Sequence, residues 1–307
     1  MCSTCGCGQP GDGGTRLTVV HAHDHHHDPT DHHHEHDEHG HDVEHGHGDG
    51  QDTGDGHGHG HDDEHGHGHG HDTGDGHGHG DDAGHGHSHQ LVQETKTVLL
   101  EQEILAKNDG LAAANRHLLQ ERGVAAINLM SSPGSGKTTL LEHTIRAIGD
   151  RRQALVIEGD QETLYDAERI RATGTKVVQI NTGAGCHLDA QMLTSGLAEL
   201  APPDGALVFV ENVGNLVCPA LFDLGEAARV VIISVTEGAD KPAKYPYMFR
   251  TADLVLLNKI DLLPYVDFDV DLCLRQIAQI KPDAKILQVS ATKGTGMEAW
   301  YDWLSRL

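Results

Sequence analysis

Hydrophobic residues are concentrated in residues 91–307, where short apolar runs alternate with segments of helical periodicity. A short apolar run between turn residues is typical of a buried strand, whereas apolar positions spaced by helical turns indicate a helix. Because the strand runs are continuously apolar, both faces of the sheet should be covered. The pattern predicts an α/β domain with a mostly parallel sheet flanked by helices. The expected strands are Val124–Met130, Ala154–Ile157, Lys176–Ile180, Ala206–Val210, Arg229–Val235, Leu254–Leu257 and Lys285–Val289, and the expected helices are 137–148, 161–172, 188–199, about 267–280 and 296–305.

Residues 94–121, ahead of the first expected strand, also have helical periodicity. The turn-forming string Asn108-Asp109-Gly110 interrupts them, and Asn108 is suited to cap a helix that begins there. The sequence therefore predicts two helices that are broken near Asn108. Residues 91–307 are long enough for one domain with a sizeable core.

Residues 21–89 differ from the rest of the chain because they hold 25 of its 28 His residues, among Asp, Glu and Gly. Such a segment cannot bury enough apolar surface to offset its conformational entropy, so we expect residues 21–90 to be disordered. Neutral imidazoles and carboxylates together suit divalent nickel, zinc and copper. A solvated acidic linker would explain the acids but not the His residues, so a metal-binding segment is favoured.

The formal net charge of −25 at pH 7 is concentrated in the same part of the chain. Residues 1–90 carry nineteen acids against one base, which gives −18. This acidity argues against a nucleic acid as a partner. No apolar stretch is long enough to cross a membrane and no secretory signal is visible, so we expect a cytoplasmic protein.

The 6 Cys residues do not suit a disulfide framework in a chain of 307 residues. Cys2, Cys5 and Cys7 lie together within residues 1–20. Three thiolates at this spacing, separated by small residues, can surround one ion without a preformed fold. We expect an N-terminal metal-binding motif, for which the spacing leaves nickel and zinc open. Cys273, on an apolar helix, is expected in the core.

The first expected strand is followed by a Walker A sequence, Ser131-Ser132-Pro133-Gly134-Ser135-Gly136-Lys137-Thr138. Ser131 takes the place of the first Gly of the pattern. Gly134 and Gly136 allow backbone N–H groups to close around phosphate oxygens at a helix N-terminus. Lys137 can reach the terminal phosphates, and Thr138 can ligate Mg²⁺. The residues expected to bind the nucleotide here are Gly134, Ser135, Gly136, Lys137, Thr138 and Thr139.

Another expected strand ends in Asn258-Lys259-Ile260-Asp261, which resembles the NKxD sequence of GTP-binding domains. The Asp261 carboxylate can accept both the N1 and the N2 hydrogens of guanine, a pair that adenine does not offer. Lys259 would lie over the base, and Asn258 would brace the loop. Ser290 and Ala291, after the next strand, resemble the loop whose backbone contacts guanine O6. GTP is therefore favoured over ATP.

Residues between these loops should respond to the γ-phosphate. Glu211 ends an expected strand in the position of a Walker B acid, where it would hold Mg²⁺, and the Gly214 amide would contact the phosphate. Asp160 is a candidate for water orientation or metal contact. Together with Lys137, Asp160 and Glu211 are the expected catalytic residues. Turnover should be slow, because no catalytic Arg or Gln is evident.

A second metal site is expected beside these residues, formed by Cys186, His187 and Cys218. Both segments follow strands of the same sheet, close to the expected γ-phosphate. Two thiolates and one imidazole leave a tetrahedral ion short of one ligand. Either water completes the site, or a symmetric dimer supplies ligands from both subunits.

These motifs together resemble the HypB family of nickel-incorporation GTPases of [NiFe]-hydrogenase maturation. The resemblance rests on the leading Cys residues, the His-rich insert, residues 132–139, Glu158-Gly159-Asp160, Gly185-Cys186-His187-Leu188, residues 211–219 and residues 258–261. It implies a SIMIBI-type P-loop GTPase domain over residues 91–307 that dimerises with GTP or metal. It also implies a metal site at the dimer interface, and as partners a HypA-type chaperone and the hydrogenase large-subunit precursor.

The resulting hypothesis is a GTPase that stores nickel and delivers it to the hydrogenase precursor. Its ligands would be GTP, Mg²⁺ and Ni²⁺, with Zn²⁺ as the alternative metal. Nucleotide binding would reorder the loops that bear Asp160 and residues 211–218, and thereby alter metal affinity at Cys186, His187 and Cys218. The alternatives are a urease-type maturation GTPase and a metal-storage protein whose GTPase domain only dimerises. A small-molecule kinase would not need the residues at 258–261.

Overall fold

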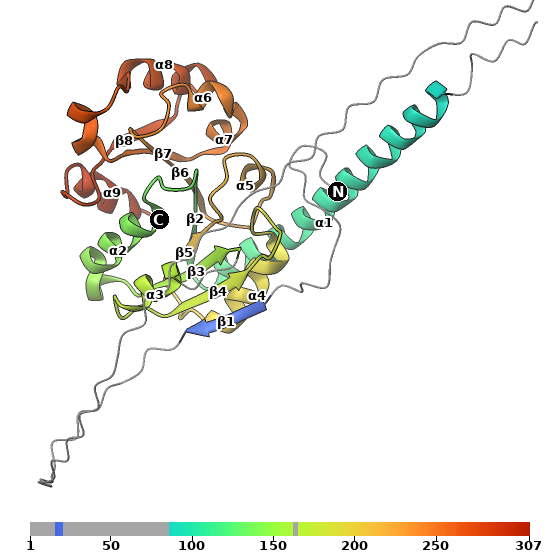
Figure 1. The fold of residues 1–307 in the computed structure, drawn as a ribbon. Coiled ribbons are helices and arrows are strands. Elements are labelled where there is room, and N and C mark those ends of the chain that lie inside the picture. The colour runs from blue at the N-terminus through green and yellow to red at the C-terminus, as the bar shows by residue number, and fades with distance from the viewer. Residues whose placement is uncertain (1–15, 21–85, 162–164) are drawn as a thin grey trace, which may run out of the picture. The chain divides into compact units, whose positions relative to one another are not determined.

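The computed structural model describes residues 16–20, 86–161 and 165–307. Its centre is an eight-stranded sheet with the order β1-β4-β3-β5-β2-β6-β7-β8 (Figure 1). β1 is antiparallel to β4, and the other neighbouring strands are parallel. The predicted α/β class is thereby confirmed. The strands are β1 (Arg16–Val20), β2 (Ala125–Ser131), β3 (Ala154–Asp160), β4 (Val177–Asn181), β5 (Leu207–Glu211), β6 (Ala228–Ser234), β7 (Leu254–Asn258) and β8 (Lys285–Gln288).

Helices cover both faces of the sheet, because successive side chains of the buried strands point to opposite faces. In β2, Ile127 and Leu129 pack with one set of helices, whereas Ala126 and Met130 pack on the other side. The first set is α2 (Lys137–Ile148), α3 (Tyr165–Arg171) and α9 (Met297–Leu304). The second set is α1 (Gly86–Glu121), α4 (Ala190–Leu200), α7 (Pro246–Thr251) and α8 (Val270–Ile280). Shorter helices are α5 (Cys218–Leu221), α6 (Lys241–Lys244), η1 (Gly149–Arg151) and η2 (Ile260–Tyr265).

The predicted break near Asn108 is wrong, because α1 continues through Asn108-Asp109-Gly110. Asn108 does not cap its own helix. Its side-chain oxygen accepts a 2.9 Å hydrogen bond from the Ala190 amide, and its Nδ2 donates to the Asp223 carbonyl at 2.8 Å. Arg116, further along the helix, donates to both Asp223 carboxylate oxygens at 2.7 Å. α1 thus joins the start of α4 to the segment that follows α5.

The sequence did not predict β1, and its register determines where the chain enters and leaves the sheet. Arg16 pairs with Asn181 and Val20 pairs with Val177, at opposite ends of β4. Because the strands are antiparallel, the chain reaches β1 at the edge where the parallel strands end. It leaves β1 at the opposite edge.

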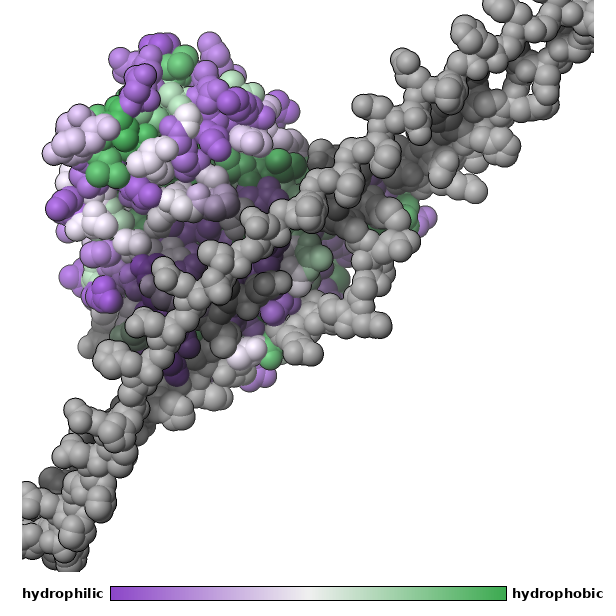
Figure 2. Space-filling view, viewed as in Figure 1, coloured by the Kyte–Doolittle hydropathy of each residue, from purple (hydrophilic) through white to green (hydrophobic). Residues whose placement is uncertain are grey.

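Figure 2 shows that the visible face of the described residues is mainly hydrophilic, with small hydrophobic areas between the polar ones. Among the large hydrophobic side chains, Tyr165 and Tyr265 are the most exposed, at 68% and 82%. Within the described part of the chain, no helix combines the length and the apolar character needed to cross a membrane.

Candidate functional site

The predicted nucleotide loops lie together at the carboxyl edge of the sheet, the edge where the parallel strands end. The Walker A loop follows β2, while β3 ends in Asp160, β5 ends in Glu211 and β7 ends in Asn258. Ligands of open parallel sheets bind beyond this edge. The fold therefore places the motifs where the sequence analysis expects a nucleotide.

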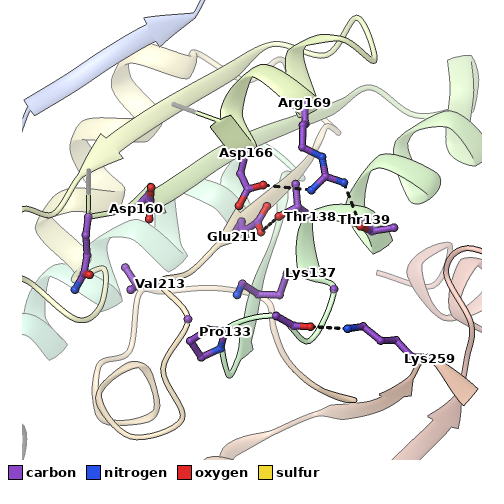
Figure 3. Close-up of a pocket in the computed structure, with 14 residues that line it drawn as sticks. Pro133, Lys137, Thr138, Thr139, Asp160, Asp166, Arg169, Glu211, Val213 and Lys259 are labelled. Carbon is purple, nitrogen blue, oxygen red and sulfur yellow. Dashed lines mark hydrogen bonds and ion pairs between the residues drawn. The ribbon is translucent and has the colours of Figure 1, made fainter. Parts of the chain in front are cut away.

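These loops surround a cavity of about 490 Å³ (Figure 3). Eight residues that the sequence analysis assigned to phosphate or Mg²⁺ chemistry line the cavity: Gly134, Gly136, Lys137, Thr138, Thr139, Asp160, Glu211 and Gly214. Lys259 of the base loop also lines it, at the opposite side from Asp160 in this view. Ser135, by contrast, is fully buried and is not among the residues that line the cavity.

The Walker A loop has the backbone geometry that its Gly residues predict. Gly134 and Gly136 have φ angles of 74° and 96°, in the region that favours glycine, and α2 begins directly after them. Lys137 Nζ donates a 2.9 Å hydrogen bond to Ser131 Oγ. Ser131, which departs from the Walker A pattern, thus contacts the lysine that the pattern requires.

Thr138 and Glu211, the two predicted Mg²⁺ ligands, are in direct contact. Thr138 Oγ1 donates a 2.6 Å hydrogen bond to Glu211 Oε1. Burial raises the pKa of Glu211, while the charge of Lys137 and the hydrogen bond from Thr138 lower it. Its other oxygen, Oε2, has no hydrogen-bond partner. A hydroxyl and a carboxylate with a spare acceptor fit the oxygen-rich, partly hydrated coordination of Mg²⁺.

Glu158 was named in the sequence analysis only as part of a string, and the structure gives it a place beside this pair. It is paired with Glu211 in the register of β3 and β5 and is 3% exposed. Burial raises the pKa of Glu158 to about 9, with further contributions from the charges of Glu211 and Asp160. Strand register, which residue spacing does not reveal, brings these acids together.

Asp166, Arg169 and Gln161 also line the cavity and were not predicted as site residues. Arg169 donates hydrogen bonds to Thr139 and Glu142 at 3.1 and 2.9 Å, and to Asp166 at 3.3 Å (Figure 3). The sequence predicts no catalytic Arg or Gln, and the structure places Arg169 and Gln161 at the cavity wall. Residue spacing along the chain does not indicate Arg169, because α3 reaches the cavity only through tertiary packing.

The base loop is fastened to the phosphate loop and to the next strand. Asn258 Nδ2 donates a 3.0 Å hydrogen bond to the Ser135 carbonyl, and Lys259 Nζ donates to the Gly134 carbonyl at 2.6 Å. Ser290 Oγ donates to Asp261 Oδ1 at 2.6 Å. The Ala291 amide donates to Asn258 Oδ1 at 3.3 Å. All the residues predicted to recognise guanine therefore meet at this loop.

The structure also brings together Cys186, His187 and Cys218. Their potential ligand atoms all lie within 4.8 Å of one another. Cys218 is buried and Cys186 is partly buried. Burial lowers the pKa of His187, against the raising effect of Asp189, so the imidazole is neutral near pH 7. Two thiols and a neutral imidazole are the donor set of a soft or borderline divalent ion.

Asn212 links this cluster to the nucleotide cavity. It directly follows Glu211, and its Oδ1 accepts hydrogen bonds from the amides of Leu188 at 3.1 Å and Val213 at 3.0 Å. Its Nδ2 donates to Asn128 Oδ1 at 3.1 Å. Asn215 Nδ2 donates to the Cys186 carbonyl at 3.5 Å. The loops that carry the two groups of residues are thus joined by direct hydrogen bonds.

The remaining predicted metal-binding residues, Cys2, Cys5 and Cys7 and the His residues of 21–85, lie outside the described residues. β1, which follows the N-terminal motif in the sequence, is described. Arg16 pairs with Asn181, six residues before His187, at the carboxyl edge of the sheet. Cys273 is fully buried, as predicted, and burial raises its pKa to about 11.

Comparison with known proteins gives a consistent set of relatives. The family CobW/HypB/UreG, nucleotide-binding domain, matches residues 125–288. Hydrogenase maturation factor HypB of Azotobacter chroococcum mcd 1 is 56% identical over 215 residues, which cover 70% of this chain and 70% of that protein. HypB from Archaeoglobus fulgidus has a TM-score of 0.62 at 45% identity, over 66% of this chain and 98% of that one. HypB from Helicobacter pylori, solved in complex with nickel, has a TM-score of 0.61 at 39% identity, over 65% and 94% of the two chains.

Proposed function

The chain belongs to the HypB family of hydrogenase maturation factors, and from this premise we propose that it is a GTP-hydrolysing nickel metallochaperone. It would store nickel and deliver it to the large subunit of a [NiFe]-hydrogenase. One observation carries the proposal: a Cys186/His187/Cys218 cluster, suited to a divalent ion, lies on loops hydrogen-bonded to the loop of Glu211. The nickel complex of the Helicobacter pylori relative supports nickel as the cargo.

Guanine specificity would come from Asp261. Its carboxylate accepts the N1 and N2 hydrogens of the base, and the hydrogen bond from Ser290 holds it in place. Lys259 lies against the phosphate loop, where its aliphatic part can cover the base. Adenine presents no matching pair of donors, so ATP would bind more weakly.

The phosphates would be held by the backbone amides of residues 134–139 and by Lys137. The Lys137 ammonium, now hydrogen-bonded to Ser131 Oγ, would bind phosphate oxygens instead, and Thr138 and Glu211 would hold Mg²⁺. Mg²⁺ would neutralise charge on the β- and γ-phosphates. Asp160, at the cavity wall, would orient the attacking water, and the Gly214 amide would contact the γ-phosphate.

The nucleotide state would reach the metal cluster through Asn212. A movement of Glu211 shifts Asn212, whose Oδ1 holds the Leu188 amide next to His187. The same segment continues through Asn215 to Cys218. The path from the phosphates to the cluster consists of only a few direct contacts. A small displacement at the phosphates would therefore change the distances among the two thiols and the imidazole.

The N-terminal parts would supply the metal. Residues 1–20 would carry the Cys2/Cys5/Cys7 site, residues 21–90 would store further ions, and residues 91–307 would form the GTPase domain. The pairing of Arg16 with Asn181 supports transfer from the Cys motif, because β1 begins at the edge that bears the cluster. We further propose that the protein dimerises with GTP or metal and that it is cytoplasmic. Its partners would be a HypA-type chaperone and the hydrogenase large-subunit precursor.

A complementation experiment tests this function. The wild-type chain should restore hydrogenase activity to cells that lack their own maturation factor, and Cys186→Ala, Cys218→Ala and Lys137→Ala should not. Cys273→Ala is the matched control, since this Cys is buried in the core away from the cluster. Purified protein should hydrolyse GTP in preference to ATP. Full restoration by Cys186→Ala, or equal use of ATP, would contradict the proposal.

A further inference from the structure

Two buried carboxylates lie side by side next to the nucleotide cavity, and one of them, Glu211, lines it. Glu158 on β3 and Glu211 on β5 are partners in the parallel register of these neighbouring strands. Side chains at paired positions extend from the same face of a sheet. Glu158 is 3% exposed and Glu211 is 4% exposed. Water therefore screens their mutual repulsion poorly.

Each of these carboxylates has an oxygen with no hydrogen-bond partner, Oε2 in both cases. Buried polar atoms in folded proteins are nearly always hydrogen-bonded, so each exception calls for an explanation. Two orphaned acceptors on adjacent strands are destabilising by themselves, because a charged acceptor needs a donor or a cation when it leaves water.

The two cations near these carboxylates do not balance their charges. Arg169 acts on Glu211, but it is itself hydrogen-bonded to Glu142 and Asp166. Lys137 lies close enough to lower the pKa of both carboxyls, but its ammonium is hydrogen-bonded to Ser131. The other charges that act on Glu158 are the acids Glu211, Asp160 and Asp166. The arrangement concentrates negative charge next to Thr138, beside the expected phosphates.

We infer that Glu158 is a further residue of the magnesium site, and that its Oε2 and that of Glu211 together hold the hydrated Mg²⁺ that accompanies the nucleotide. The inference rests on the proposed GTP-binding function. It assigns a role to a residue that neither the Walker A sequence nor the Walker B position identifies.

The chemistry of Mg²⁺ accounts for both orphaned oxygens. This ion keeps several of its waters and binds proteins through one or two carboxylates together with substrate phosphates. Waters on the ion donate hydrogen bonds to carboxylates that do not touch it. A dication held near Glu158 and Glu211 would therefore favour the ionised form of both carboxyls, and its waters would supply the missing donors.

The experiment compares the full chain with Glu158→Gln, Glu211→Gln and Glu199→Gln. Glu199 is exposed on α4, so its variant removes one charge away from the cavity. Mn²⁺ titrations of the GDP complex, followed by electron paramagnetic resonance, report metal binding directly. GDP affinity in EDTA and the melting temperature without metal report the integrity of the pocket and of the fold.

We expect Glu158→Gln to weaken Mn²⁺ binding by about tenfold or more. Mutation of residues that support a metal site typically lowers metal affinity by this amount. Its GDP affinity in EDTA should match the wild type, and its metal-free melting temperature should be equal or higher, because a neutral amide of the same size replaces a buried acid. Glu199→Gln should behave as the wild type.

Unchanged Mn²⁺ affinity in Glu158→Gln, together with weak binding in Glu211→Gln, would overturn the inference and leave the proposed function intact. A lower melting temperature or an equal loss of GDP affinity in EDTA would assign Glu158 a purely structural role and would also overturn it. If the wild-type GDP complex bound no Mn²⁺, both the inference and the proposed magnesium site would fail.

Discussion

The side-chain amide of Asn258 donates a 3.0 Å hydrogen bond to the backbone carbonyl of Ser135, and so fastens the base loop to the phosphate loop. The contact is tight enough that a Cβ atom on Gly136 would lie 2.8 Å from Asn258 Nδ2. Gly136 also has a positive φ angle, so glycine is required there for two reasons. Base recognition and phosphate binding are therefore parts of one rigid unit.

Replacement of Asn258 by Ala should destabilise the protein by about 1–3 kcal/mol, because it leaves buried backbone groups of Ser135 and Ala291 without partners. GDP affinity should fall as well, while the preference for guanine over adenine persists through Asp261. Urea denaturation and nucleotide titration measure both effects. Lys259→Met is the control for stability. The hydrogen bond from Lys259 to the Gly134 carbonyl is solvent-exposed, so its loss should lower the free energy of unfolding by less than about 1 kcal/mol.

Asp261→Asn should lower GTP affinity by at least about tenfold, because it removes an ionised acceptor of two hydrogen bonds. The Ser290 hydroxyl can still donate to the amide oxygen, so the fold should be preserved. Xanthine carries a C2 carbonyl in place of the amine of guanine, and the new amide donor should improve binding of xanthosine triphosphate. Competition with a fluorescent GDP measures the affinities of the variant and the wild type for GTP and for xanthosine triphosphate. Equal GTP affinity in variant and wild type would show that Asp261 does not contact the base.

Asn212→Ala should uncouple the two sites without removing a residue proposed to bind metal or nucleotide. It deletes the acceptor for the Leu188 and Val213 amides and the donor to Asn128. We expect the ratio of nickel affinities in the GTP-analogue and GDP complexes to approach one, while GDP affinity changes little. Nickel titration of both complexes gives the ratio. Retention of the wild-type ratio would mean that the coupling takes another route.

Asp223 should give the stability of the protein a specific acid dependence. Burial opposes ionisation, but the hydrogen bonds from Arg116 and the Gly225 amide outweigh it, so the folded-state pKa of Asp223 lies below its ordinary value. The resulting stability is present above the unfolded-state pKa of about 3.9 and is lost as the pH falls through the folded-state pKa. The partly exposed pair contributes about 1 kcal/mol.

Asp223→Asn should therefore lose this contribution at pH 7. It should differ less from the wild type as the pH falls through the folded-state pKa of Asp223, because the side chain is then neutral in both proteins. Denaturant unfolding at several pH values measures the difference. Asp204→Asn removes a pair with Arg122 whose carboxylate is 78% exposed, and should change stability little at any pH. A pH-independent difference between Asp223→Asn and the wild type would contradict the assigned pKa direction.

Local sequence was sufficient for the elements and motifs that depend on neighbours along the chain. The Walker A loop, the loop of Asn258 and Asp261 and the seven apolar strands follow from residue type and spacing, and the structure contains each of them. The clustering of Cys186, His187 and Cys218 was also predictable, because strands of one parallel sheet end at one edge.

Features that depend on distant partners were not predictable in this way. The turn-forming string at Asn108 remains helical because Asn108 bonds Ala190 and Asp223 instead of its own helix. β1 forms by pairing with residues more than 150 positions away, and its five residues carry little pattern of their own. Arg169 reaches the cavity through helix packing, and Glu158 lies beside Glu211 through strand register. Spacing along the chain encodes neither.

The central claim is that the nucleotide state controls metal affinity at Cys186, His187 and Cys218. The most direct test uses the full chain with Cys2, Cys5 and Cys7 replaced by Ala, titrated with nickel in its GDP and GTP-analogue complexes. Charge-transfer absorption between thiolate and nickel reports ligation by Cys186 and Cys218 even while the His-rich segment binds other ions. The account predicts half-saturating nickel concentrations that differ by at least about fivefold between the complexes. Identical titrations, or no thiolate absorption in either complex, would contradict it.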